Sequence, residues 1–132
     1  MSCVVDASVL VKALVDAGPA GEWAELIVAG GLLHAPQLAL AETVNILRRL
    51  ERAEAITAAE ASAAFEDLMQ LNIELFSFEP FAERIWELRH NLTSYDAWYV
   101  ALAEALHLPL ATLDERLAKS KGPRCEFLTP RS

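Results

Sequence analysis

The sequence predicts an α/β fold with a small, mostly parallel five-stranded sheet wrapped by about seven helices. Short apolar runs, several rich in β-branched residues, alternate along the chain with longer stretches of helical periodicity. This is the pattern of strand and helix units that build a parallel sheet. The runs are apolar on consecutive residues, as expected for strands covered on both faces. The 132 residues are 54% apolar, which is enough for a domain with its own core.

The N-terminal part should form one strand and two helices. Cys3–Val5 is a brief apolar run that ends sharply before residues with helical spacing. It therefore predicts a buried strand, followed by a helix over Ala7–Val15. Gly18-Pro19 ends that helix, and proline is favoured in a first helical turn. We expect Pro19 to begin a second helix that stops at Gly30-Gly31.

A second strand and two longer helices should follow. Leu32–Ala35 is a short apolar run closed by Pro36, and Gln37–Arg52 has the length and spacing of a helix. The next helix is expected over Thr57–Gln70, because Thr57 and Glu60 have the spacing of a capping box.

The C-terminal half should contain the remaining strands. Ile73–Phe78 combines β-branched and aromatic residues, which favours a strand. Pro80 should begin a helix that ends at His90, and Thr93 with Ser94 should cap a helix over Tyr95–Leu106. The last expected elements are a strand over 110–112, a short helix over 114–119 and a strand over 125–128.

We expect one domain over residues 1–129 and a flexible tail over residues 130–132. Cys3 and Cys125 lack C-x-x-C spacing, so neither a zinc site nor a disulfide framework is expected. No apolar stretch reaches the roughly 20 residues that cross a bilayer, and the N-terminus lacks the basic lead of a signal peptide. We therefore expect a cytoplasmic protein with no membrane partner.

The formal charge of −8, from 19 acidic against 11 basic residues, argues against a basic surface that holds nucleic acid through its phosphates. It does not exclude a nuclease. Acidic residues that converge on metal ions leave a locally positive field where a phosphate would bind.

Four acidic residues interrupt apolar segments. Asp6 follows the first strand and Asp114 follows the fourth, so the two should face each other if those strands flank the point where the strand order reverses. Glu42 lies in the apolar helix segment LALAETVNIL, and Asp96 lies in the first turn of another apolar helix. Carboxylates brought together repel by several kcal/mol at an effective dielectric of about 20 and need cations. Oxygen ligands select Mg²⁺ or Mn²⁺.

Structural roles are the alternative for these acids. Glu42 could pair with Arg49 or another base, and capping could account for the others. Asp6 could cap the helix that follows it. Asp96 has capping-box spacing with Thr93, and Glu115 has the same spacing with Thr112, next to Asp114. The protein would then be a catalytically inactive partner-binding module. Its mean hydropathy of +0.25 would suit exposed apolar surface that awaits a partner.

Four segments contain these acids: VVDASVLVKAL, LALAETVNILRRL, TSYDAWYVALAEAL and LATLDERL. Through these segments the sequence resembles the PIN-domain nucleases, and among them the VapC-type toxins of prokaryotic toxin–antitoxin pairs. The segments occur in the family's order and span nearly the whole chain.

The resemblance implies a Mg²⁺- or Mn²⁺-dependent endoribonuclease that is neutralised by a cognate antitoxin and forms a homodimer within a toxin–antitoxin assembly. Transferred residue by residue, the catalytic and metal-binding acids are Asp6, Glu42, Asp96 and Asp114, with Glu42 acting directly or through water. Ser8, Asn45 and Thr112 are expected to orient these carboxylates.

Basic and aromatic side chains offer further candidates for RNA contact. The basic ones, each of which is equally compatible with a solvated helix face, are Arg48, Arg49, Arg52, Arg116, Lys119, Lys121 and Arg124. Trp98 and Tyr99 follow Asp96 closely, but their helical spacing favours positions in the core over a role in base stacking.

Overall fold

The structure is a computed structural model, and it describes residues 1–130. Its strands are β1 (Cys3–Val5), β2 (Leu33–Pro36), β3 (Ile73–Phe76), β4 (Leu110–Ala111) and β5 (Phe127–Leu128). Its α-helices are α1 (Ala7–Val15), α2 (Pro19–Ala29), α3 (Leu38–Arg52), α4 (Ala58–Gln70), α5 (Ala82–Glu87), α6 (Ser94–Leu106) and α7 (Glu115–Ala118). A single 3₁₀ turn, η1 (Glu79–Phe81), precedes α5 in this part of the chain.

The five strands form one sheet in the order β3-β2-β1-β4-β5, and every pair is parallel. This confirms the predicted fold class. The chain moves outward from β1 through β2 to β3 and then crosses to β4 on the other side of β1. The strand order therefore reverses between β1 and β4, and both strands end at the same edge of the sheet.

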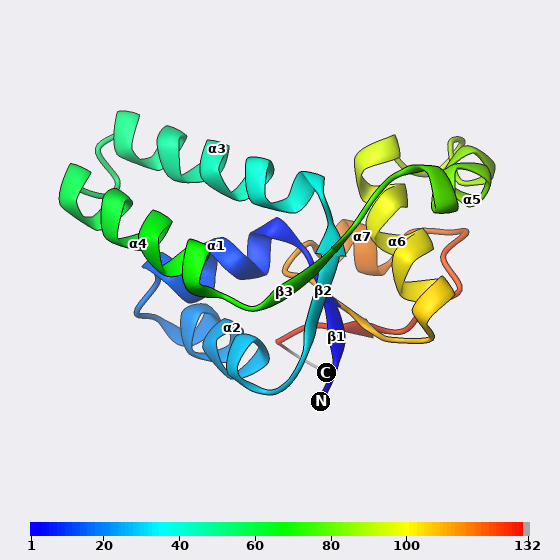
Figure 1. Cartoon of the computed structure of the whole chain (residues 1–132), viewed down its shortest axis with the longest axis horizontal. Helices are drawn as coiled ribbons and strands as arrows, with labels where there is room; N and C mark the ends of the chain where they lie inside the picture. Colours follow the sequence, from blue (N-terminus) through cyan, green and yellow to red (C-terminus); the bar gives the residue numbers. More distant parts are fainter. Residues whose placement is uncertain (131–132) are drawn as a thin grey trace.

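Helices cover both faces of the sheet. Figure 1 shows α1 to α4 on one side of the strands, with α3 and α4 as an antiparallel pair that extends away from the sheet, and α5 and α6 on the other side. Successive side chains of β1 alternate between the two layers. Cys3 and Val5 pack with Val9 and Leu10 of α1, whereas Val4 packs with residues of α6 such as Val100.

Some element bounds differ from the prediction. The strand expected over 73–78 ends at Phe76, because the backbone of Phe78 is already helical and leads into η1. The helix expected over 80–90 is divided into η1 and the six residues of α5, after which the chain turns at Leu88. β4 and β5 are each two residues long. The expected tail lies outside the described residues except for Pro130.

The capping predictions are confirmed at α4 and wrong at α7. Thr57 and Glu60 form both bonds of the capping box. At α7 the N-cap is Asp114, not Thr112, because Thr112 directs its hydroxyl elsewhere. In the described part of the chain no helix is long and apolar enough to cross a membrane.

Candidate active site

Asp6 lies at the end of β1 with only 7% of its surface exposed. It caps α1, accepting from the Val9 backbone N–H through Oδ1. The hydroxyl of Ser8 also donates to Oδ1, and the hydroxyl of Thr112 donates to Oδ2. Burial raises the pKa of Asp6 from 3.8 to about 6, although these hydrogen bonds oppose the rise. The capping role is therefore real, but it accounts for only part of what surrounds this carboxylate.

The two hydroxyls connect the ends of β1 and β4. Ser8 Oγ accepts a hydrogen bond from the Leu113 backbone N–H at 3.2 Å, and Thr112 Oγ1 accepts one from the Asp114 backbone N–H at 3.0 Å. Each hydroxyl thus donates to Asp6 and accepts from the loop after β4. The pairing of Val5 with Ala111 brings these segments together.

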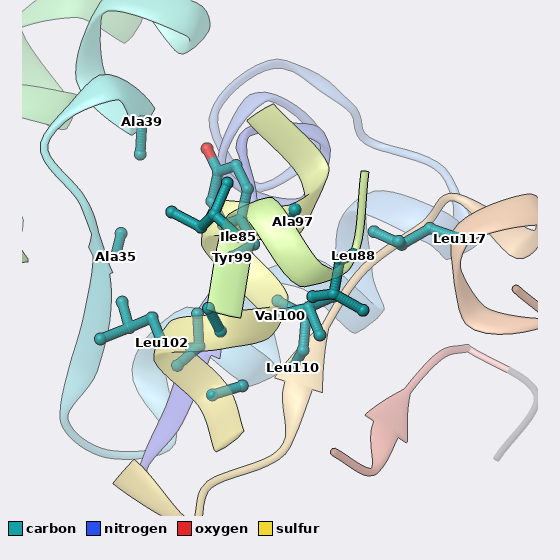
Figure 2. Packing of buried hydrophobic residues seen from close by; sticks show 13 residues of the cluster. Ala35, Ala39, Ile85, Leu88, Ala97, Tyr99, Val100, Leu102, Leu110 and Leu117 are labelled. Carbon is teal, nitrogen blue, oxygen red and sulfur yellow. The ribbon is translucent and has the colours of Figure 1, made fainter. Parts of the chain in front are cut away.

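Glu42 extends from α3 to meet Tyr99 of α6. The Tyr99 hydroxyl donates to Glu42 Oε1 at 2.5 Å. Figure 2 shows the Tyr99 ring among the buried side chains, with its oxygen on the side where Ala39 of α3 lies. Burial, the bond to Glu42 and the charges of Glu42 and Asp6 all raise the pKa of Tyr99. The phenol therefore stays protonated and donates to Glu42.

Among the described residues, Glu42 has no basic ion-pair partner. Burial raises the pKa of Glu42 and the charge of Asp96 raises it further, while the bond from Tyr99 opposes both. In residues 1–130, no Lys, Arg or His side chain forms an ion pair with Glu42 or with the other three predicted acids.

Asp96 and Asp114 line one hollow of about 220 Å³. Asp96 lies in the first turn of α6, where its backbone N–H donates to Thr93 Oγ1 at 3.2 Å. Asp114 is exposed and accepts from the backbone N–H groups of Arg116 and Leu117. Burial raises the pKa of Asp96, and the charge of Asp114 raises it further. The two carboxylates are therefore close enough to repel.

The four predicted acids thus form what we call the acidic row, defined as Asp6, Glu42, Asp96 and Asp114. The charges of Asp6 and Glu42 both raise the pKa of Tyr99. The charge of Asp96 raises the pKa of Glu42, and the charge of Asp114 raises the pKa of Asp96. Within residues 1–130, however, no three Asp, Glu, His or Cys side chains are arranged closely enough to hold a metal ion as they stand. Side-chain movement would be needed to close such a ligand set.

The chemistry of the acidic row nevertheless fits a divalent cation. The donors are carboxylate oxygens, which Mg²⁺ and Mn²⁺ prefer. Although the charge of Arg116 opposes it at Asp96, the repulsion between neighbouring carboxylates is what a bound cation would relieve.

The other predicted site residues divide into two groups. Ser8 and Thr112 lie directly on Asp6, where they can fix its orientation. Asn45 is exposed one turn after Glu42 on α3 and forms no hydrogen bond with the acidic row in the described structure. Its expected role in orienting a carboxylate stays a prediction.

The helical spacing predicts a core position for Tyr99, and the residue is 3% exposed. Its additional contact with Glu42 was missed, although one signal was available. A glutamate in an apolar helix needs a donor, and a buried tyrosine hydroxyl needs an acceptor.

Comparison with known proteins assigns the chain to a family. The model of the PIN domain family matches residues 3–122. The chain therefore belongs to the PIN-domain family.

Within this family, the chain is similar to ribonucleases named VapC. It is 45% identical to ribonuclease VapC1 of Mycobacterium tuberculosis over 131 residues, which cover 95% of each chain. Among solved structures, PAE2754 from Pyrobaculum aerophilum aligns with a TM-score of 0.71 and 25% identity, over 96% of this chain and 83% of that one. VapBC2 from Rickettsia felis, bound to a DNA fragment from its promoter, shares the fold with a TM-score of 0.67 and 14% identity, over 98% of both chains. The chain is thus a VapC-type member of the family.

Proposed function

We propose that this VapC-type protein is a metal-dependent endoribonuclease that hydrolyses RNA phosphodiester bonds at the acidic row. The observation that carries the proposal is the placement of four carboxylates without a basic ion-pair partner, in residues 1–130, around the edge where β1 and β4 end. Such a row serves little purpose in a structural module, because carboxylates that repel one another destabilise the fold.

Asp6, Asp96 and Asp114 would hold Mg²⁺ or Mn²⁺, with Glu42 ligating directly or through water. When bound, the ion supplies Lewis acidity and increases the acidity of water near the scissile phosphate. Ser8 and Thr112 keep the buried Asp6 carboxylate in one orientation. Tyr99 holds Glu42 by a hydrogen bond that favours the ionised carboxylate, which would accept a proton from the attacking water.

We also propose that the protein is the toxin of a toxin–antitoxin pair, and that it acts in the cytoplasm as a homodimer bound by a cognate antitoxin. The support from this chain is an apolar groove of about 410 Å³ between α1 and α3, lined in part by Val11, Val15, Ile46 and Leu50. A groove of this kind can receive the apolar face of a partner segment.

The experiment that tests the nuclease is cleavage of total cellular RNA by the purified protein. Cleavage should require Mg²⁺ or Mn²⁺, stop with EDTA and disappear in Asp96→Asn. The matched control is Asp67→Asn, which removes the same charge from an exposed position on α4 and should leave cleavage unchanged. If wild-type protein neither cleaves RNA nor binds metal in calorimetry, the alternative of a catalytically inactive partner-binding module replaces the proposal.

A further inference from the structure

The structure separates the basic residues that the sequence left equivalent, and Lys121 lines neither the hollow with Asp96 nor the one with Lys119. Arg48, Arg49 and Arg52 lie on the half of α3 that Figure 1 shows extending away from the sheet. Arg124 lies beside Glu104, which accepts a hydrogen bond from its backbone N–H at 2.7 Å. Lys119 lines a separate hollow with Glu115 and Thr129. Of the described cationic side chains, Arg116 alone lines the hollow that contains Asp96 and Asp114.

The Arg116 side chain is available to bind a ligand. Its guanidinium forms no hydrogen bond or ion pair with other residues in the range 1–130, and the residue is exposed. It lies close enough to Asp96 for its charge to lower the pKa of that carboxyl, against the larger effect of burial. A guanidinium presents a planar set of donors that matches two oxygens of a phosphate.

Neutral polar groups complete the hollow. Asn91, Thr93 and Ser120 line it together with Arg116. Thr93 Oγ1 accepts from the Asp96 backbone N–H, so its hydroxyl proton remains able to donate. The volume of about 220 Å³ leaves room for more than a single water molecule.

The position of the hollow relative to the acidic row indicates which part of a substrate it would receive. Asp96 and Asp114 form one wall, whereas neither Asp6 nor Glu42 lines it. The hollow therefore lies at one end of the row, where a polyanion with its scissile phosphate at the row would carry its neighbouring phosphate.

We propose that Arg116, with Thr93 and Asn91, forms a subsite for the RNA phosphate adjacent to the scissile one. The inference rests on the proposed nuclease function. Arg116 acts here as a binding residue for the substrate backbone, and it should contribute affinity without base preference, because phosphate contacts carry no sequence information.

The test is equilibrium binding of a short, labelled, single-stranded RNA of mixed sequence at a series of KCl concentrations with Mg²⁺ present. It uses the Asp6→Asn background, which should prevent cleavage while leaving the hollow intact. Arg116→Gln should weaken binding about tenfold, as expected when hydrogen bonds from a charged donor are lost. The slope of log affinity against log salt should fall by about 0.7, the value for one phosphate contact on a single strand.

Lys119→Gln is the matched control, because it removes an equal charge from the same short segment but from the neighbouring hollow. It should change the affinity for RNA less than twofold, as expected for an exposed charge that does not contact the RNA. Arg116→Lys should keep the salt slope while losing part of the affinity. If Arg116→Gln binds like Lys119→Gln, or if Arg116→Lys loses the salt slope as fully as Arg116→Gln, the subsite is refuted.

The same variants in the otherwise wild-type protein distinguish this inference from the nuclease proposal. Arg116→Gln should raise KM much more than it lowers kcat. If Arg116→Gln shows metal-dependent cleavage with an unchanged KM, the subsite is refuted and the nuclease proposal is retained. Absence of cleavage in the wild-type protein would refute the nuclease, and absence of RNA binding in the Asp6→Asn protein would refute the subsite.

Discussion

Replacing Tyr99 with phenylalanine removes one hydroxyl from the core and leaves Glu42 without its donor. The ring stays in place, so packing is largely retained. A hydrogen bond to a charged group contributes about 1.5–3 kcal/mol, and one between neutral groups about 0.5–1.5 kcal/mol. At neutral pH, where we expect Glu42 to be ionised, Tyr99→Phe should therefore destabilise the metal-free protein by about 1.5–3 kcal/mol.

This loss should depend on pH in a defined direction. The Tyr99 bond lowers the pKa of Glu42, so it stabilises the ionised carboxylate, and its full contribution is present only above the Glu42 titration. As the pH falls through that titration, the bond becomes a neutral one. The difference in stability between wild type and Tyr99→Phe should then shrink by roughly 1 kcal/mol.

Thermal unfolding in EDTA measures both effects. For a chain of this size, 1 kcal/mol corresponds to about 3–5 °C in Tm, so Tyr99→Phe should melt about 5–15 °C lower at neutral pH. Tyr95→Phe is the control, because Tyr95 lies on the same helix with 58% of its surface exposed. The reasoning fails if the two variants melt together at neutral pH, or if the loss in Tyr99→Phe is the same on both sides of the Glu42 titration.

Two further predictions concern the acidic row. Because burial raises the pKa of Asp6 from 3.8 to about 6, the folded protein binds this proton more tightly than the unfolded chain does, so metal-free stability should fall as pH rises between those values. Asp6→Asn should remove that part of the pH dependence and stabilise the metal-free protein at neutral pH by up to about 3 kcal/mol. Urea unfolding at several pH values measures this, and an Asp6→Asn protein no more stable than wild type at neutral pH would contradict the prediction. Mn²⁺ at about 100 times its Kd should stabilise the wild type by about 2.7 kcal/mol. The resulting increase in Tm should be much smaller in Asp114→Asn. An equal increase in both proteins would exclude Asp114 as a metal ligand.

The sequence by itself determined the fold class and most of the elements, because these depend on local patterns. Short apolar runs between helical stretches can be buried only as strands covered on both faces. Thr57 with Glu60 defined the start of α4 through bonds that span a single turn. The bounds were least accurate at Phe78 and His90, because the backbone is already helical at Phe78 and α5 ends before Leu88.

The acidic residues were identified from the sequence because each interrupts an apolar segment, but their surroundings depend on the register of the sheet. The bond from Thr112 to Asp6 joins residues 106 positions apart, and it exists because β4 pairs with β1. The bond from Tyr99 to Glu42 spans 57 positions and needs side chains of α6 and α3, which cover opposite faces of the sheet, to meet. Likewise, tertiary structure alone placed Arg116 in the hollow with Asp96 and Asp114 while directing Lys119 to another. Periodicity specifies which face of a helix is buried, whereas the partner of a side chain on that face is decided by how distant segments pack.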